Sequence, residues 1–256
     1  SKLATGDGDN FVRLWDIPSR QEIATLTGHL DAVVTVAFSP DGGTLASGSD
    51  AGVTKLWDVG GGQAIATLAG HTNEVSALAF SSDGQTLATG SYDRTVRLWD
   101  VASGRETAVL TGHESYILMV AFRPDGGSVV SGSHLNGPRD TGPSGDAIKV
   151  WDIASGQQVD SFGPPAFNVG KLAFSRDGQI VATSGGPTGA EIALWEVASG
   201  RRLDILTAGD GYLYDVAFSP DGTALAAGGA DGVTLWDVAS GRVLAALDGW
   251  TPTFSP

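Results

Sequence analysis

The sequence contains no cysteine and only one methionine in 256 residues, which excludes disulfide bonds and thiolate chemistry. Long apolar runs are also missing: none approaches the roughly 18 residues of a membrane-spanning helix, and no signal peptide is recognisable. Lysine and arginine are scarce, 15 against 29 aspartates and glutamates, and the net charge is −14. Because nucleic-acid binding needs clustered basic residues, we expect no binding to nucleic acid. We also expect a cytoplasmic protein that does not bind a membrane.

What the sequence does contain is a repeated unit, which is most complete at residues 70–105. Apolar runs alternate there with turns rich in Asp, Ser and Gly, a pattern that predicts short strands joined by hairpins. The first three strands are apolar on both faces, as in a sheet covered by two neighbours, and the fourth has the polar positions of an outer edge. The predicted strands are 75–80, 85–91, 95–100 and 106–112.

A Trp-Asp pair ends the third strand of most units. The tryptophans are Trp15, Trp57, Trp99, Trp151, Trp195 (followed by Glu196) and Trp236, at intervals of 42, 42, 52, 44 and 41 residues. Together with Gly-His at 28–29, 70–71 and 112–113, this pattern resembles the WD-repeat β-propeller family. The resemblance covers nearly the whole chain. It implies an all-β fold of four-stranded antiparallel blades in a single domain, residues 1–256, and the regular repeats are similar to those of bacterial members.

Six blades are expected. Residues 1–28 align with the second, third and fourth strands of a unit and lack the first. Residues 250–256 end in Phe-Ser-Pro, as first strands do, and we expect them to complete the N-terminal blade and remove an open sheet edge. The short spacing before Phe254 opposes that closure, as does Pro252, which cannot donate to a ladder. The alternative is a portion of a seven-bladed or longer array.

Four residues of the reference unit match the hydrogen-bonded tetrad of the family: His71, Thr89 (or Ser91), Asp93 and Trp99. In such a tetrad the Asp orients the imidazole, which contacts a strand hydroxyl, and the hydroxyl accepts from a buried indole N–H. Similar residue types form hydrolase triads, but a catalytic set has no reason to recur in successive units, so no catalytic residue is assigned. Partial copies are predicted at His29, Ser47 and Trp57 and at His113, Ser131 and Trp151.

No metal or cofactor site is predicted. The segment GDGDN at 6–10 has alternating carboxylates but lacks the glycine spacing and distal Glu of a calcium loop, and it aligns with a turn. The four histidines have no zinc-binding spacing. The glycines of 185–189 precede no helix that could hold a phosphate.

All four tyrosines fall near the predicted turns between second and third strands or before first strands, which a propeller places on one face. Tyrosine supplies large contact area at low entropic cost, and nearby carboxylates favour a basic or polar ligand. The alternative is that some rings plug the channel or pack under loops. The predicted partner-binding residues are Tyr92, Tyr116, Tyr212, Tyr214, Phe167, Trp250, Asp31, Asp50 and Glu74, with the insertion at 134–145 on the same face.

The first functional hypothesis is a non-catalytic, monomeric scaffold that binds a protein or peptide through this face. The alternative, implied only by the resemblance to bacterial members, is the sensor arm of a larger signalling protein with a kinase or nucleotide-binding module. A catalytic propeller is the third hypothesis. Four compared first strands offer only Asp215 as an ionisable residue, and one carboxylate is too little for general acid–base catalysis.

Overall fold

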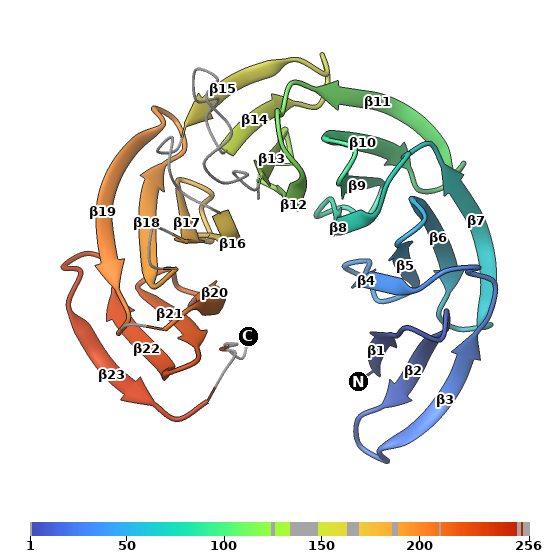
Figure 1. The fold of residues 1–256 in the computed structure, drawn as a ribbon, viewed down its shortest axis with the longest axis horizontal. Coiled ribbons are helices and arrows are strands. Elements are labelled where there is room, and N and C mark those ends of the chain that lie inside the picture. Colours follow the sequence, from blue (N-terminus) through green and yellow to red (C-terminus); the bar gives the residue numbers. More distant parts are fainter. Residues whose placement is uncertain are drawn as a thin grey trace. The chain divides into compact units, whose positions relative to one another are not determined.

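The computed structural model describes residues 2–123, 126–133, 148–162, 169–185, 189–209, 211–249 and 252. Every regular element in these residues is a β-strand, and the strands pair into antiparallel sheets in sequence order (Figure 1). The chain divides into two compact units, Ser1–Phe122 with Ile153–Gln157 and Arg123–Asp152 with Gln158–Pro256. In the described ranges no helix is long and apolar enough to cross a membrane.

The first unit contains three sheets and one further strand. The first sheet has three strands, β1 (Lys2–Gly6), β2 (Val12–Asp16) and β3 (Gln21–Leu26). The second has four, β4 (Val33–Phe38), β5 (Thr44–Ser49), β6 (Val53–Asp58) and β7 (Gln63–Ala69). The third consists of β8 (Val75–Phe80), β9 (Thr86–Ser91), β10 (Thr95–Asp100) and β11 (Arg105–Thr111), and β12 (Ile117–Phe122) follows.

The remaining strands also form four-stranded sheets. The sheet that begins with β12 continues with β13 (Ser128–Ser133), β14 (Ile148–Asp152) and β15 (Gln158–Phe162). The fifth sheet consists of β16 (Val169–Phe174), β17 (Ile180–Gly185), β18 (Glu191–Glu196) and β19 (Arg201–Thr207). The sixth consists of β20 (Leu213–Phe218), β21 (Ala224–Gly229), β22 (Gly232–Asp237) and β23 (Val243–Leu247).

These sheets confirm the predicted all-β architecture of six blades. The strands of the reference unit agree with the sequence prediction to within one residue. Among the described residues the first sheet has three strands, β1 to β3, which correspond to the second, third and fourth strands expected from the N-terminal residues. The proposed closing segment 250–256, of which only Pro252 is described, and the insertion at 134–145 lie outside the described residues.

Each sheet contains a β-bulge directly before its tryptophan. The register between the third and fourth strands shifts at Leu14/Trp15, Leu56/Trp57, Leu98/Trp99, Val150/Trp151, Leu194/Trp195 and Leu235/Trp236. A bulge re-aims a side chain and increases local twist. The repeated tryptophan therefore follows the register shift that interrupts the pairing of the third and fourth strands in each sheet.

Neighbouring sheets of the first unit pack tightly through a glycine in each second strand. The second strands β1, β5 and β9 each contact the first strand of the following sheet, β4, β8 and β12 respectively (Figure 1). A Cβ atom on Gly48 would come within 2.7 Å of a methyl of Val75, and one on Gly90 within 2.6 Å of a methyl of Ile117. The buried side chains Val75 and Ile117 open the strand of the next sheet. Glycine is required here because the facing side chain fills the space of a Cβ atom.

Four turns between first and second strands share the sequence Ser-x-Asp-Gly and one hydrogen-bond pattern. In each turn the serine Oγ donates to the aspartate Oδ1 over 2.6 Å, and the backbone N–H two residues after the aspartate donates to the same oxygen. These bonds lower the pKa of every one of the four carboxyl groups, and that of Asp221 falls to about 2. The aspartates are Asp41, Asp83, Asp177 and Asp221.

Candidate functional site

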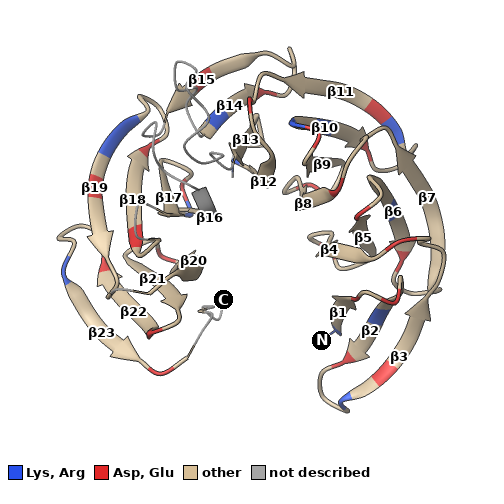
Figure 2. Cartoon of the chain, viewed as in Figure 1, with Lys and Arg blue, Asp and Glu red and all other residues tan. Residues whose placement is uncertain are grey.

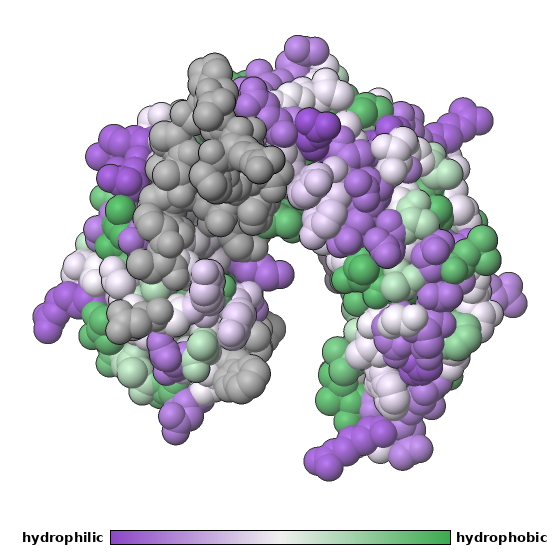
Figure 3. All heavy atoms as spheres, viewed as in Figure 1, coloured by the Kyte–Doolittle hydropathy of each residue, from purple (hydrophilic) through white to green (hydrophobic). Residues whose placement is uncertain are grey.

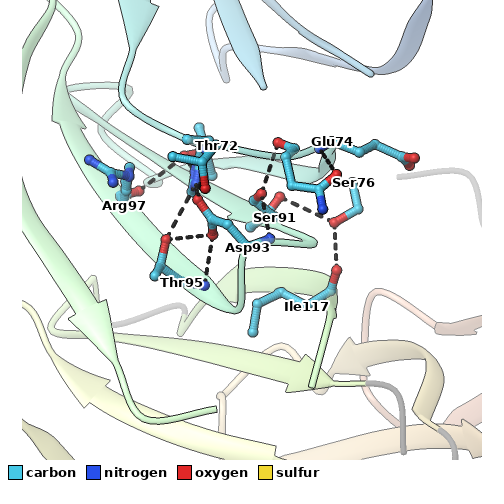
Figure 4. Close-up of polar contacts among 12 residues, drawn as sticks. Thr72, Glu74, Ser76, Ser91, Asp93, Thr95, Arg97 and Ile117 are labelled. Carbon is cyan, nitrogen blue, oxygen red and sulfur yellow. Dashed lines mark hydrogen bonds and ion pairs between the residues drawn. The ribbon is translucent and has the colours of Figure 1, made fainter. Parts of the chain in front are cut away.

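The third sheet contains a continuous hydrogen-bonded chain of four side chains, shown in part in Figure 4. Asp93 Oδ2 lies 2.8 Å from His71 Nδ1, and His71 Nε2 lies 2.7 Å from Thr89 Oγ1. Trp99 Nε1 donates to Thr89 Oγ1 over 2.9 Å. The hydroxyl of this chain thus belongs to Thr89, whereas Ser91 donates to the backbone carbonyl of Asn73.

Asp93 is held by more donors than the sequence suggested. The backbone N–H and hydroxyl of Thr95 donate to its Oδ1 over 2.9 and 2.7 Å, and the N–H of Thr72 donates to its Oδ2 over 3.1 Å (Figure 4). Burial alone would raise the pKa of Asp93, but hydrogen bonds from Thr95 and His71 outweigh it and the pKa is lowered. Thr95 was not predicted, although a hydroxyl residue two positions after a turn aspartate is a recognisable signal.

Every hydrogen bond in this chain is donated in the direction from Trp99 towards Asp93. Burial lowers the pKa of His71, so the neutral ring donates from Nδ1 to Asp93 and accepts at Nε2 from the Thr89 hydroxyl, whose oxygen accepts from the indole. Thr89 is 0% exposed. A hydroxyl that is engaged on both sides and buried has no path to a substrate, which argues for a structural role and against a nucleophile.

Parts of the same hydrogen-bonded chain are described in other sheets. His29 Nε2 lies 2.6 Å from Ser47 Oγ, which accepts from Trp57 Nε1 over 2.7 Å. Trp151 donates to Ser131 over 2.7 Å, and His113 is buried. Two indole–hydroxyl pairs that were not predicted complete the series: Trp15 with Thr5 and Trp195 with Thr183.

His29, which contacts Ser47 and Trp57 of the second sheet, should make the stability of the protein depend on pH. Burial first, and then the charge of Lys55, lowers the pKa of His29 to about 4. The unfolded chain therefore takes up this proton before the folded one, and the free energy of unfolding should fall as the pH drops from about 6.5 towards 4. Replacing Ala51 by Asp supplies a carboxylate and should make the fall smaller. Urea unfolding of both proteins at pH 7 and pH 5 measures this, and an equal fall in both would contradict it.

The predicted partner-binding residues of the first unit fall on adjoining turns. The N–H of Tyr92 donates to the carbonyl of Glu74, and the N–H of Asp50 donates to that of Ala32, so the turn after each second strand is joined to the segment before its own first strand. The rings of Tyr92 and Tyr116 stack across neighbouring sheets, with centroids 4.8 Å apart and planes at 20°. Tyr116 remains 40% exposed.

Two carboxylates adjoin the stacked rings. Burial, and then Asp50, raises the pKa of Glu74; burial, Glu74 and Tyr116 raise the pKa of Tyr92. Asp50, Glu74, Tyr92 and Tyr116 thus form one neighbourhood, named here the acidic-aromatic surface. Asp31 is exposed in the segment before β4. Figure 2 shows the acidic residues mainly in turns and at strand ends, and basic ones on strands such as β2 and β10.

The other predicted residues lie in the second unit or outside the described ranges. Tyr212 precedes β20 and is 68% exposed, with its ring against Gly189. Tyr214 is the second residue of β20, where a bulge between Leu213 and Asp215 leaves it unpaired and half-exposed. Phe167 and Trp250 lie outside the described residues.

The segments weighed for metal or acid–base chemistry have other contacts. Asp7 and Asp9 of the GDGDN turn form ion pairs with Arg13. Asp215 Oδ1 accepts from the N–H of Val216 over 2.9 Å. The first strand β16 contains Lys171, a second ionisable residue beside Asp215 in this class of strand. Among the described residues no group of three or more His, Asp or Glu side chains could hold a metal ion.

Several known proteins resemble this chain over short segments. Ribosome assembly protein 4 of Saccharomyces cerevisiae is 44% identical over 46 residues, 18% of this chain and 9% of that protein. Protein tipD of Dictyostelium discoideum is 49% identical over 39 residues, 15% of this chain and 6% of that protein. The U5 small nuclear ribonucleoprotein 40 kDa protein of Mus musculus is 46% identical over 41 residues, 16% and 12%. Each match covers about one repeat, and the chain spans a small fraction of these eukaryotic relatives.

The family model described as "WD domain, G-beta repeat" matches residues 20–58, 62–100, 104–152 and 200–237, more than half of the chain. Each matched segment begins in or just before the last strand of one sheet and ends at the Trp-Asp position of the next. Strands β16–β18, which end in Trp195-Glu196, are not matched. The chain belongs to the WD40 repeat family, whose members are typically non-catalytic protein-interaction scaffolds.

Proposed function

We propose that this protein is a scaffold that binds a basic peptide or protein segment on the acidic-aromatic surface. The observation that carries the proposal is the stacked pair Tyr92–Tyr116 beside Glu74 and Asp50. Stacked, partly exposed rings next to carboxylates suit a Lys or Arg side chain, because its apolar stem packs on a ring and its charge meets both the ring face and the carboxylate.

The charge pattern supports the same ligand. Burial first, and then the negative charge of Asp50, raises the pKa of Glu74. A cation bound between the two carboxylates would relieve their repulsion, whereas an acidic ligand would increase it. In the view of Figure 3 apolar residues of the first unit appear as separate spots among hydrophilic ones. Recognition through charge and rings fits this surface better than recognition through a broad apolar patch.

Replacing Tyr92 and Tyr116 together by Ala should weaken binding of a Lys/Arg-rich peptide at least tenfold, because both the ring faces and their buried contact area are lost. The melting temperature should change by only a few degrees. Isothermal titration against a fixed-length peptide library of matched basic and acidic sequences measures this. The control is Ile65→Ala with Val109→Ala, two exposed side chains on the last strands β7 and β11, which should bind as the parent does.

Variants of the two carboxylates distinguish this proposal from nonspecific hydrophobic binding. Asp50→Asn with Glu74→Gln keeps both rings and should remove the preference for basic over acidic peptides, together with most of the salt dependence. Unchanged affinity for the basic peptide in both the tyrosine and the carboxylate variants would overturn the proposed surface. Tyr212 and Asp31 are tested singly in the same assay, since each is exposed and was predicted to contribute.

The alternative function, a sensor arm of a larger signalling protein, rests on the resemblance to bacterial members. The cytoplasmic location and a single monomeric domain over residues 1–256 remain predictions. Expression of the full gene product followed by light scattering tests the last of these. None of them changes the expected behaviour of the acidic-aromatic surface.

A further inference from the structure

The second sheet carries the tetrad of the third sheet with one member missing. His29, Ser47 and Trp57 reproduce the contacts of His71, Thr89 and Trp99. Ala51 stands where the third sheet has Asp93, and Val53 stands in place of Thr95. The proton chain of the second sheet therefore ends at Nδ1 of His29, whose only described hydrogen-bond partner is Ser47 at the other ring nitrogen.

A cleft lies beside His29. It has a volume of about 190 Å³, and its lining includes His29, Leu30, Asp31, Val53 and Lys55. His29 is 7% exposed, and its Nε2 is fixed against Ser47, so Nδ1 is directed away from the strand hydroxyl. The buried imidazole thus presents an unused donor to a space that solvent can enter.

The third sheet shows what such donors bind. Asp93 accepts from His71 Nδ1 and from the N–H of Thr72. The corresponding donors in the second sheet are His29 Nδ1 and the N–H of Leu30, and Lys55 adds a positive charge close enough to influence His29. Lys55 Nζ donates to Thr67 Oγ1 over 2.9 Å, which holds the ammonium group beside the cleft.

We propose that this cleft is a binding site for a single carboxylate group, which takes the place of the missing Asp93 equivalent and completes the tetrad. The ligand bonds to His29 Nδ1 and the Leu30 N–H, with Lys55 as its counter-charge. Asp31, also in the lining, opposes an anion, so we expect a dissociation constant in the millimolar range for a small carboxylate. The carboxylate comes either from a free acid or from an acidic residue of a bound chain.

The primary test is a titration of the folded protein with sodium acetate at pH 7, with sodium chloride at matched ionic strength as the reference. The ring nitrogens of His29, followed by nitrogen-detected NMR, should shift saturably, while those of His71, whose Nδ1 is already engaged, stay in place. In the Ala51→Asp variant the built-in carboxylate fills the site, so acetate should no longer move His29. A matched variant, Lys55→Gln, should weaken acetate binding several-fold.

A thermal readout accompanies the titration. Acetate should raise the melting temperature of the parent protein above the chloride reference and leave that of Ala51→Asp unchanged, because only the parent has a site to fill. The proposal is wrong if the His29 shift is linear in acetate, or if Ala51→Asp responds as the parent does. Two further probes distinguish the sources: N-acetylglycine presents a terminal carboxylate, and N-acetylglutamine amide with N-acetylglutamate amide tests a side-chain carboxylate against its neutral analogue.

The cleft lining contains none of the four residues that define the acidic-aromatic surface, and its test uses no peptide partner. Failure of acetate to bind would leave the binding assay of Tyr92 and Tyr116 unaffected. Conversely, loss of peptide binding in the tyrosine variant would leave the acetate response of His29 intact.

Discussion

Replacing Thr89 by Val is expected to lower the free energy of unfolding by about 3 kcal/mol. The side chain is fully buried, and its oxygen is the shared partner of His71 Nε2 and Trp99 Nε1. Valine has nearly the same shape but no hydroxyl, so the substitution leaves two buried polar groups without a partner. Each such group costs about 1–3 kcal/mol.

Thr183→Val is the matched control for this effect. Thr183 is also buried, and Trp195 Nε1 donates to it over 3.0 Å, but no described histidine bonds to it. Only one group loses its partner, so the loss should be about half of that for Thr89→Val. Urea unfolding followed by tryptophan fluorescence and circular dichroism measures both, and hydrogen exchange in β9–β10 and β17–β18 localises them. Equal losses at the two sites would show that the histidine adds nothing to the chain.

The second large effect concerns the fit of Gly48 against Val75. Gly48→Ala should cost about 2 kcal/mol, because its Cβ would meet Val75 Cγ1 at 2.7 Å and a methyl of Thr35 at 2.9 Å, and overpacked cores lose about 1–3 kcal/mol. Val75→Ala should cost a similar amount by opening a cavity. The double variant should lose about 1 kcal/mol less than the sum, because Val75→Ala removes the Cγ1 contact while the Cβ of residue 75 and the Thr35 methyl, each at 2.9 Å, remain.

A double-mutant cycle in urea tests this coupling directly. The control cycle pairs Gly48→Ala with Ile117→Val, which alters the next junction and should give additive losses. Additivity between Gly48 and Val75 would contradict the close fit of the two sheets. The same fit recurs between Gly90 and Ile117 and between Gly6 and Val33, so we expect coupled pairs at each of these junctions.

Much of the fold could be predicted because each copy of the repeat can be compared with the others. Alternating apolar runs and Asp-Gly turns fix strand boundaries, and a 42-residue interval places the same residue at the same point of each sheet. The tetrad positions could be predicted for the same reason: His71 and Trp99 recur in register, so their counterparts in the second sheet follow by alignment. Of the predicted site, this was the part with a periodic signal.

Features without a period could not be predicted in this way. The stacking of Tyr92 on Tyr116 depends on how far one turn reaches towards the next sheet, and neither ring recurs at its position in the neighbouring unit. The bulge before each tryptophan leaves no mark in composition, because both residues of the pair remain apolar. The bulge that leaves Tyr214 unpaired in β20 leaves no such mark either.

The Ser-x-Asp-Gly turns also bear on how the protein ages. Among the dipeptides that begin with aspartate, Asp-Gly is the most prone to form a succinimide and then isoaspartate, because the glycine nitrogen is unhindered and attacks the side-chain carboxyl carbon of the aspartate. At Asp41, Asp83, Asp177 and Asp221 the carboxylate is tied to a serine hydroxyl and a later N–H, and its lowered pKa keeps it in the unreactive ionised form. Four chemically fragile links are thereby protected for as long as the chain is folded. The amount of isoaspartate that forms at each turn on storage would therefore measure how long that one of the four sheets has been unfolded.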